Sequence, residues 1–258
     1  MDAPIEKIVP LPTVATSTRL RSAILNGELP ALTAEFAFSR EHFLSLDGDG
    51  YYPLVWAAQE GCLPQVASAV KEAGQRLILE DFLTPTRFGD SSVHPAALTG
   101  HLDQIAAVVK ESGQRLTLEH LLAGNGSNSS PLYWAAHGGH LDQVAALLKD
   151  SGETLAAEHF LAPNASGKTP LIQAAEHDNL RQVFQPSLWH GRVPEMLRLW
   201  CHVPEENRSQ IDFPKITRQT LFLSRTVPPR LDPDAFRAAS RPAIALPTRE
   251  TPVREHGQ

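Results

Sequence analysis

The segment most similar to a chemical site is Ala-Pro-Asn-Ala-Ser-Gly-Lys-Thr at residues 162–169. It approaches the phosphate-binding pattern G-x-x-x-x-G-K-[ST], in which backbone N–H groups and the lysine hold phosphate oxygens. The first glycine of that pattern is replaced by Ala162, no β-strand is expected before the segment, and Pro170 follows it immediately. The same place in an internal repeat is occupied by residues 45–52, 84–91 and 123–130. We therefore interpret 162–169 as a repeated hairpin loop and expect no nucleotide cofactor.

Pairs of adjacent acidic and histidine residues recur along the chain and suggest metal ligands. Two adjacent residues on a helix point about 100° apart, so one pair cannot close around a single ion. Equivalent residues of neighbouring packed helices lie about 10 Å apart, whereas a zinc–nitrogen bond is about 2 Å long. We expect no metal site and interpret the pairs as a solvated face or as caps of a short helix. The pairs are Glu41-His42, Glu80-Asp81, Glu119-His120 and Glu158-His159.

The remaining histidines and the cysteines show no spacing that is typical of a catalytic group. His101 and His140 each begin a predicted helix and precede Leu and Asp, which indicates local hydrogen bonding at the helix start. Only Cys62 and Cys201 are present, too few for a disulfide scaffold or a four-cysteine zinc finger and typical of a reduced compartment. We predict no catalytic residue.

An internal repeat with a period of 39 residues positions all of these side chains. In each copy a tripeptide ending in two alanines precedes a glycine (aspartate in the last copy) and then a Leu-x-Gln-Val/Ile run. Repeats of this length form stacked units, none of which can bury its apolar face alone. The equivalent tripeptides are Trp56-Ala57-Ala58, Pro95-Ala96-Ala97, Trp134-Ala135-Ala136 and Gln173-Ala174-Ala175.

Each repeat is predicted to contain two antiparallel helices. In the best copy Ser130 is the N-cap of the first helix, Pro131 suits its first turn, and Gly139 ends it in a left-handed conformation. The second helix follows, with an apolar stripe at Leu141, Val144, Leu147 and Leu148.

Two motifs carry a resemblance to a known family. Residues 169–174 read Thr-Pro-Leu-Ile-Gln-Ala, which matches the Thr-Pro-Leu-His-x-Ala consensus of the ankyrin repeat. Gly-His-Leu at residues 139–141 matches the start of that family's second helix. The chain therefore resembles the ankyrin repeat family from about residue 15 to 185. The period is six residues longer than the family's 33, and the consensus histidine survives only as His94.

An added segment in every copy accounts for the longer period. Its apolar residues at the beginning and the end suit one face of a short helical turn, which predicts a third short helix. The segments are 38–44, 77–83, 116–122 and 155–161. The hairpin loops that follow are predicted to need a positive φ at Gly50, Gly89, Asn128 and Gly167.

The predicted architecture is an all-α, ankyrin-like helical repeat solenoid with an extra short helix per repeat and a helical C-terminal cap. The Pro/Arg-rich tail lacks periodicity, and we expect it to be disordered. The predicted limits are 1–14 for an N-terminal extension, 15–185 for the repeats (15–50, 51–89, 90–128, 129–167 and 168–185), 186–224 for the cap and 225–258 for the tail.

The amino-acid composition argues against two classes of partner, nucleic acids and membranes. The formal net charge is −6 and the basic residues are scattered, whereas nucleic-acid-binding proteins cluster them on one face. No apolar run is long enough to span a bilayer, and charges and prolines stand where a signal peptide needs an apolar stretch. We expect a cytoplasmic monomer that binds neither nucleic acid nor membrane, with export by a route without such a signal left open.

The resemblance implies that hairpin tips and the exposed ends of the first helices line a concave groove that binds a partner. Residues at these places differ between copies, and Tyr51, Phe88 and Leu98 are expected to form an apolar end. The predicted partner-binding residues are Asp49, Tyr51, Gln59, Glu60, Phe88, Asp90, Leu98, Thr99, Ser127, Ser129, His137, Gly138, Ser166, Lys168, Glu176 and His177. For Trp56 and Trp134 we favour packing between repeats over a role as interface anchors.

The resemblance implies a non-catalytic protein–protein interaction module that binds an unidentified protein through this groove. Fold-level analogy is the main support for this function. The alternative is a scaffold, or a secreted bacterial effector, whose C-terminal tail carries the interaction motif.

Overall fold

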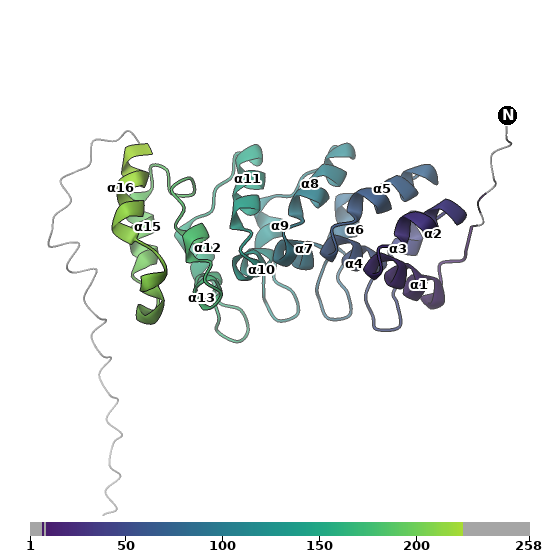
Figure 1. Cartoon of the computed structure of the whole chain (residues 1–258), viewed down its shortest axis with the longest axis horizontal. Coiled ribbons are helices and arrows are strands. Elements are labelled where there is room, and N and C mark those ends of the chain that lie inside the picture. Colours follow the sequence, from purple (N-terminus) through teal and green to yellow (C-terminus); the bar gives the residue numbers. More distant parts are fainter. Residues whose placement is uncertain (1–6, 8, 224–258) are drawn as a thin grey trace, which may run out of the picture. The chain divides into compact units, whose positions relative to one another are not determined.

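The computed structural model describes residue 7 and residues 9–223, and this part of the chain contains helices and no sheet (Figure 1). The predicted all-α class is confirmed. The predicted tail, 225–258, lies outside the described residues, as do residues 1–6 and 8 of the predicted N-terminal extension.

Three kinds of helix alternate along the chain, which confirms the predicted extra helix in each repeat. The first helices are α1 (Val14–Leu25), α4 (Pro53–Gln59), α7 (Val93–Thr99), α10 (Pro131–Gly138) and α13 (Pro170–Glu176). The second helices are α2 (Leu29–Glu35), α5 (Leu63–Glu72), α8 (Leu102–Glu111), α11 (Leu141–Ser151) and α14 (Leu180–Val183). The short helices are α3 (Arg40–Phe43), α6 (Leu79–Leu83), α9 (Leu118–Leu122) and α12 (Ala157–Leu161).

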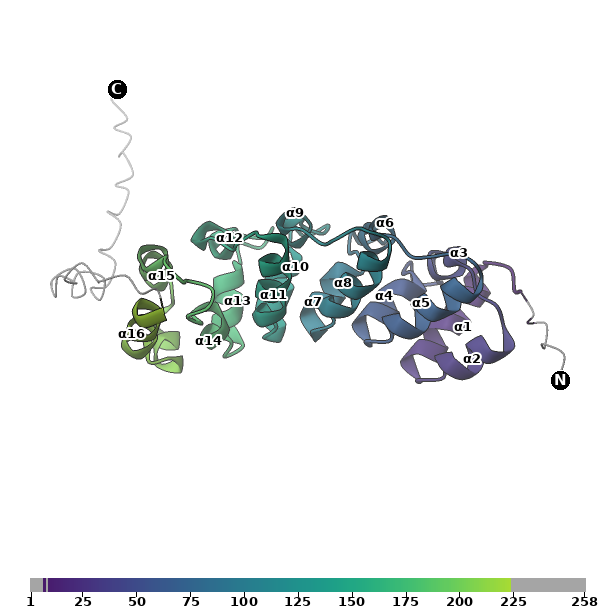
Figure 2. The same cartoon turned by 90° about the horizontal axis from the view of Figure 1, so that it is seen from above.

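The first helices stack on one another, and so do the second helices. α4 contacts α1 and α7, α10 contacts α7 and α13, and the second helices follow the same order from α2 to α14. Figures 1 and 2 show this succession, with the hairpin loops extending beyond the first helices, on the side away from the second helices. Alanines such as Ala135 and Ala136 have no exposed surface, because small side chains let adjacent first helices approach closely.

Local sequence explains where the first helices begin and end. In α10 the hydroxyl of Ser130 accepts a hydrogen bond from the backbone N–H of Tyr133 at 3.2 Å, and Pro131 stands at the first helical position. Gly139 ends the helix at φ 76°. Asp178 takes that place in the last copy with φ 59°, a left-handed conformation that aspartate tolerates better than most residues.

The recurring histidines cap the short helices. Nδ1 of His120 accepts the backbone N–H of Thr117 at 3.1 Å, and His42 and His159 make the same bond within α3 and α12. In α6 the carboxylate of Asp81 accepts the N–H of Ile78 at 2.9 Å. Histidine and aspartate interchange here because both present an acceptor to the first free N–H groups of a helix.

Side chains of the following repeat hold the short helices in place. Oε1 of Gln114 accepts the backbone N–H of Leu79 at 2.8 Å, and a carboxylate oxygen of Glu153 accepts that of Leu118 at 3.1 Å. The added segments 77–83 and 116–122 are therefore bound to the next repeat as well as to their own.

The hairpin loops repeat one hydrogen-bonding pattern. In the loop between α9 and α10, Oδ1 of Asn125 accepts the backbone N–H groups of Ser127 and Ser129, each at 2.9 Å. Asp47 and Asn164 do the same in their own loops. The predicted positive φ angles are confirmed at Gly50, Gly89, Asn128 and Gly167.

A helical cap closes the array, as predicted. It consists of α15 (Val193–Trp200), the 3-10 helix η1 (Glu205–Gln210) and α16 (Phe213–Leu223). The rings of Trp200 and Phe213 stack with centroids 4.1 Å apart, and Gln210 Nε2 donates to the carbonyl of Ala175 at 2.7 Å. Leu188, Val193, Met196 and Leu199 are buried in this cap, while Leu197 and Trp200 are half-buried.

Candidate functional site

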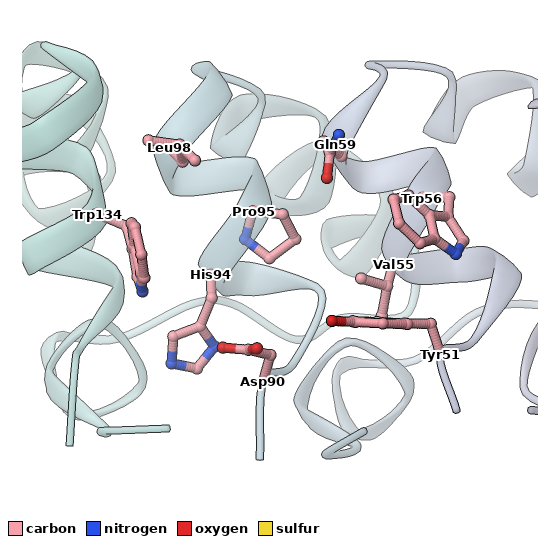
Figure 3. Close-up of a pocket in the computed structure, with 9 residues that line it drawn as sticks. All are labelled: Tyr51, Val55, Trp56, Gln59, Asp90, His94, Pro95, Leu98 and Trp134. Atoms are coloured by element: carbon pink, nitrogen blue, oxygen red, sulfur yellow. The ribbon is translucent and has the colours of Figure 1, made fainter. Parts of the chain in front are cut away.

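A pocket with a volume of about 170 Å³ opens between the first helices α4, α7 and α10 (Figure 3). Its walls are largely apolar and aromatic. The lining residues are Tyr51, Val55, Trp56, Gln59, Asp90, His94, Pro95, Leu98 and Trp134. Four of the predicted partner-binding residues, from two different repeats, are thereby brought together: Tyr51, Gln59, Asp90 and Leu98.

The pocket exists because α7 carries a small residue, proline, at the repeat position where both neighbouring first helices carry tryptophan. Trp56, Pro95 and Trp134 are equivalent residues of α4, α7 and α10, and Figure 3 shows Pro95 between the two indoles. Because proline is much smaller than tryptophan, a hollow remains over α7. Both tryptophans are half-buried, so they pack in the stack, as favoured from the sequence, and also line the pocket.

One end of the pocket continues into a cluster of aromatic rings. The ring centroid of Tyr51 lies 5.2 Å from that of Trp56 and 5.1 Å from that of Phe88. The Arg21 guanidinium lies 4.4 Å from the Trp56 ring centroid, and the indole Nε1–H of Trp56 donates to Asp47 at 3.3 Å. Phe88 is 45% exposed, so the cluster presents apolar surface beside the pocket.

Asp90 is the one acidic residue that lines the pocket. Its Oδ1 accepts a hydrogen bond from Asn125 Nδ2 at 2.6 Å. No described residue forms an ion pair with the Asp90 carboxylate. His94 does not supply the missing positive charge. The N–H of Ser91 donates to its Nδ1, which places the proton of the neutral ring on Nε2. Burial lowers the pKa of His94 despite the opposing charge of Asp90, so the ring is neutral at about pH 7.

A second group of predicted residues lies at the ends of α10 and α13. The rings of His137 and His177 stack with centroids 3.8 Å apart, and Lys168 Nζ pairs with Glu176 at 2.7 Å. Burial, followed by the charges of His177 and Lys168, lowers the pKa of His137. These four residues do not line the pocket.

The other predicted residues have local roles. Asp49 and Ser166 stand exposed at hairpin tips, where Asp49 pairs with Arg21, and Ser127 is exposed in the same position of its own loop. Glu60 is exposed at the end of α4 and accepts a hydrogen bond from Gln59. The hydroxyl of Thr99 donates to the carbonyl of Pro95 at 3.0 Å.

Two predicted residues cannot serve as freely exposed contacts. Ser129 is only 4% exposed, and its hydroxyl accepts the side-chain N–H of Asn164 from the next hairpin. Its expected exposure was wrong, because the following repeat covers it. Gly138 is a packing position, because a Cβ there would lie 1.9 Å from the carbonyl oxygen of Leu98.

Five pocket residues were not predicted as partner contacts: Val55, Trp56, His94, Pro95 and Trp134. The proline at the place of Trp56 and Trp134 was visible in the repeat alignment. The proline showed that this repeat differs from its neighbours. It could not show that a hollow forms there, because the hollow depends on how the indoles of the neighbouring repeats pack.

The segment that resembles a phosphate-binding loop is a hairpin whose polar groups are already used. Oδ1 of Asn164 accepts the backbone N–H groups of Ser166 and Lys168, each at 3.0 Å, and the Lys168 ammonium is paired with Glu176. Among the described residues no group of three or more potential metal ligands comes together. No helix in the same part of the chain has the length and apolar character to cross a membrane.

Comparison with known families identifies part of the array. Residues 104–185 match the family model for ankyrin repeats (3 copies), from within α8 to just beyond α14. No curated protein matches the chain.

Proposed function

Because the chain is an ankyrin repeat protein over residues 104–185, we propose that it binds a partner protein through the face formed by its first helices and hairpin loops. Ankyrin repeats generally mediate protein–protein interaction. The stack continues without interruption from α13 back to α1, so the proposed binding face includes repeats on both sides of α7.

The observation that carries this proposal is the contrast between constant and varied positions of the first helices. The position held by Ala57, Ala96 and Ala135 is alanine in each copy and fully buried. The position just before it varies: Trp56, Pro95 and Trp134 are half-buried there, and Gln173 of the last copy is buried. A stack needs only its shared contacts to repeat, so the varied positions are free to fit a partner.

The exposed aromatic surface beside the pocket supports the same face. Tyr51, Trp56 and Phe88 lie in ring contact, and aromatic residues are enriched at the centres of protein interfaces. We further propose that the protein acts without catalysis, as a cytoplasmic monomer. Its two cysteines, Cys62 and Cys201, are both free thiols, as in proteins of a reduced compartment.

Affinity capture from a lysate, with the captured proteins identified by mass spectrometry, tests this function. The test variant combines Tyr51→Ala, Phe88→Ala and Leu98→Ala. The matched control combines Lys71→Ala, Lys110→Ala and Lys149→Ala, at equivalent exposed positions of α5, α8 and α11. We expect the test variant to lose the protein that the wild type and the control retain.

Deletion of residues 225–258 distinguishes this function from the alternative in which the tail carries the interaction motif, either in a scaffold or in a secreted bacterial effector. The proposed function predicts that the deletion variant still captures the partner. Capture that survives the triple alanine variant but disappears with the tail would contradict the proposal.

A further inference from the structure

We propose that the pocket between α4, α7 and α10 receives the side chain of one arginine from the partner protein. This inference rests on the proposed function and names the chemistry that the partner must present. Its support comes from the size of the pocket, its walls and its charge.

The size of the pocket indicates a single side chain. Pockets for cofactors and drug-sized ligands have volumes of about 300–1,000 Å³, whereas this one has a volume of about 170 Å³. It opens on the face of the first helices, where a chain segment of a partner could lie across α7 (Figure 3).

The walls suit a long side chain with an aliphatic stem and a planar cationic end. Pro95 and Leu98 supply apolar surface from α7, and indoles stand on both sides. Guanidinium groups stack on aromatic faces while their methylene stems pack on apolar surface. Arg21 already makes such a contact with Trp56, and it comes from α1, which packs on α4 as α7 does.

Three polar atoms of the pocket can still accept a hydrogen bond; two buried donors of the walls, Nε2 of His94 and Nε1 of Trp134, also have no hydrogen-bond partner among the described residues. Oδ2 of Asp90, Oε1 of Gln59 and the hydroxyl oxygen of Tyr51 accept no hydrogen bond from the described residues. A guanidinium offers five N–H donors and no acceptor. A guanidinium can therefore donate to these three acceptors, of which Asp90 is the charged one.

The charge of Asp90 selects a cation. Asp90 is half-buried beside apolar and aromatic walls, and a charge-assisted hydrogen bond there is stronger than a neutral one. Arg21 and Lys168 are engaged with other carboxylates. Because neutral His94 adds no positive charge, an incoming arginine meets no competing cation among the lining residues. Arginine fits better than lysine because its planar fork pairs with a carboxylate and stacks on indole at once.

Selection of short random peptides on the immobilised full-length chain tests the inference. We expect the enriched peptides to share one arginine. Replacing that arginine with citrulline, which keeps the shape and removes the charge, should weaken binding at least about tenfold in fluorescence polarisation. Asp90→Asn, which keeps an oxygen for Asn125, should cause a similar loss. The two losses should not add, because they remove the same interaction.

Pro95→Trp provides a second, steric test. It places in α7 the residue that α4 and α10 carry at the same position, so the hollow is filled by a side chain that the stack accommodates elsewhere. We expect binding of the selected peptides to fall at least about tenfold, while Asp103→Asn, a control at an exposed carboxylate of α8, leaves it unchanged. Thermal denaturation by circular dichroism establishes that each variant is folded.

The outcomes separate this inference from the proposed function. Enriched peptides without a basic residue that are still lost in Pro95→Trp would overturn the arginine inference and leave the binding face in place. Peptides that bind the wild type, Pro95→Trp and the triple alanine variant alike would contradict both. Failure to enrich any peptide would also overturn the arginine inference, while affinity capture decides the function independently.

Discussion

Asn125 and Asp90 join two consecutive hairpin loops, with Asn125 Nδ2 donating to Asp90 Oδ1 at 2.6 Å. The same asparagine accepts the N–H groups of Ser127 and Ser129 within its own loop. The carboxylate that faces the pocket is thus oriented by a side chain of the next repeat. One hairpin further along, Asn164 makes the equivalent bond to Ser129.

Changing this asparagine to aspartate should make stability depend on pH. Asn125→Asp keeps the oxygen for the loop but places a second carboxylate against Asp90. Like charges raise the folded-state pKa of one of the two carboxyls above its unfolded value, so the variant gains stability relative to wild type as pH falls through that raised pKa. Urea denaturation of both proteins at about pH 7 and about pH 4.5 measures this difference. An equal stability difference at both pH values would contradict the contact.

Truncation of the Leu141 side chain tests the register of α11, the second helix of its repeat. Leu141 has no exposed surface, so Leu141→Ala should lower the free energy of unfolding by about 2–5 kcal/mol. Its neighbour Asp142 is exposed, and Asp142→Ala should change stability by less than about 0.5 kcal/mol. Chemical denaturation provides both values, and an unchanged Leu141→Ala would show that the helix is wrongly placed.

The capping role of the recurring histidines can be tested at His120. His120→Ala removes the acceptor for the N–H of Thr117 and should cost about 0.5–2 kcal/mol, as other cap losses do. His120→Asp should preserve most of the stability, because Asp81 makes the equivalent bond in α6. Denaturation curves compare the two variants. Equal losses for alanine and aspartate would show that the acceptor has no part in stabilising α9.

His137, which stacks on His177, should weaken the fold at acidic pH. The folded-state pKa of His137 is lowered, chiefly by burial, so proton binding favours the unfolded state and stability is lost as pH falls below the unfolded value of about 6.5. His137→Gln removes this contribution. Its melting temperature should therefore fall less than that of the wild type between about pH 7 and about pH 5. An identical fall in both proteins would contradict the assignment.

Local patterns in the sequence were sufficient to predict the elements of each repeat. Ser130 and Pro131 mark the start of α10, Gly139 marks its end, and positive φ follows from the residue type at Asn128 and Gly167. These signals depend on hydrogen bonds and torsion angles within a few residues, so they can be interpreted without a fold. The recurrence of each signal at the same spacing also revealed the extra short helix.

The candidate site could be predicted only in part. Resemblance indicated the hairpin tips and the ends of the first helices, and the structure places Tyr51, Gln59, Asp90 and Leu98 around one pocket there. The same reasoning placed Ser129 on the surface, where Asn164 of the next hairpin covers it. Exposure of a loop residue depends on its neighbour in the stack, which no single repeat specifies.

By itself the sequence determined that this chain is a stack of helical repeats, with hairpin tips and first-helix ends whose residues differ between copies. Only the tertiary structure decided that the hollow over Pro95 becomes a pocket with Asp90 beside it. The reason is physical. Helix starts, turns and caps are set by interactions within one repeat, whereas an unfilled volume depends on side chains that three repeats bring to the same place.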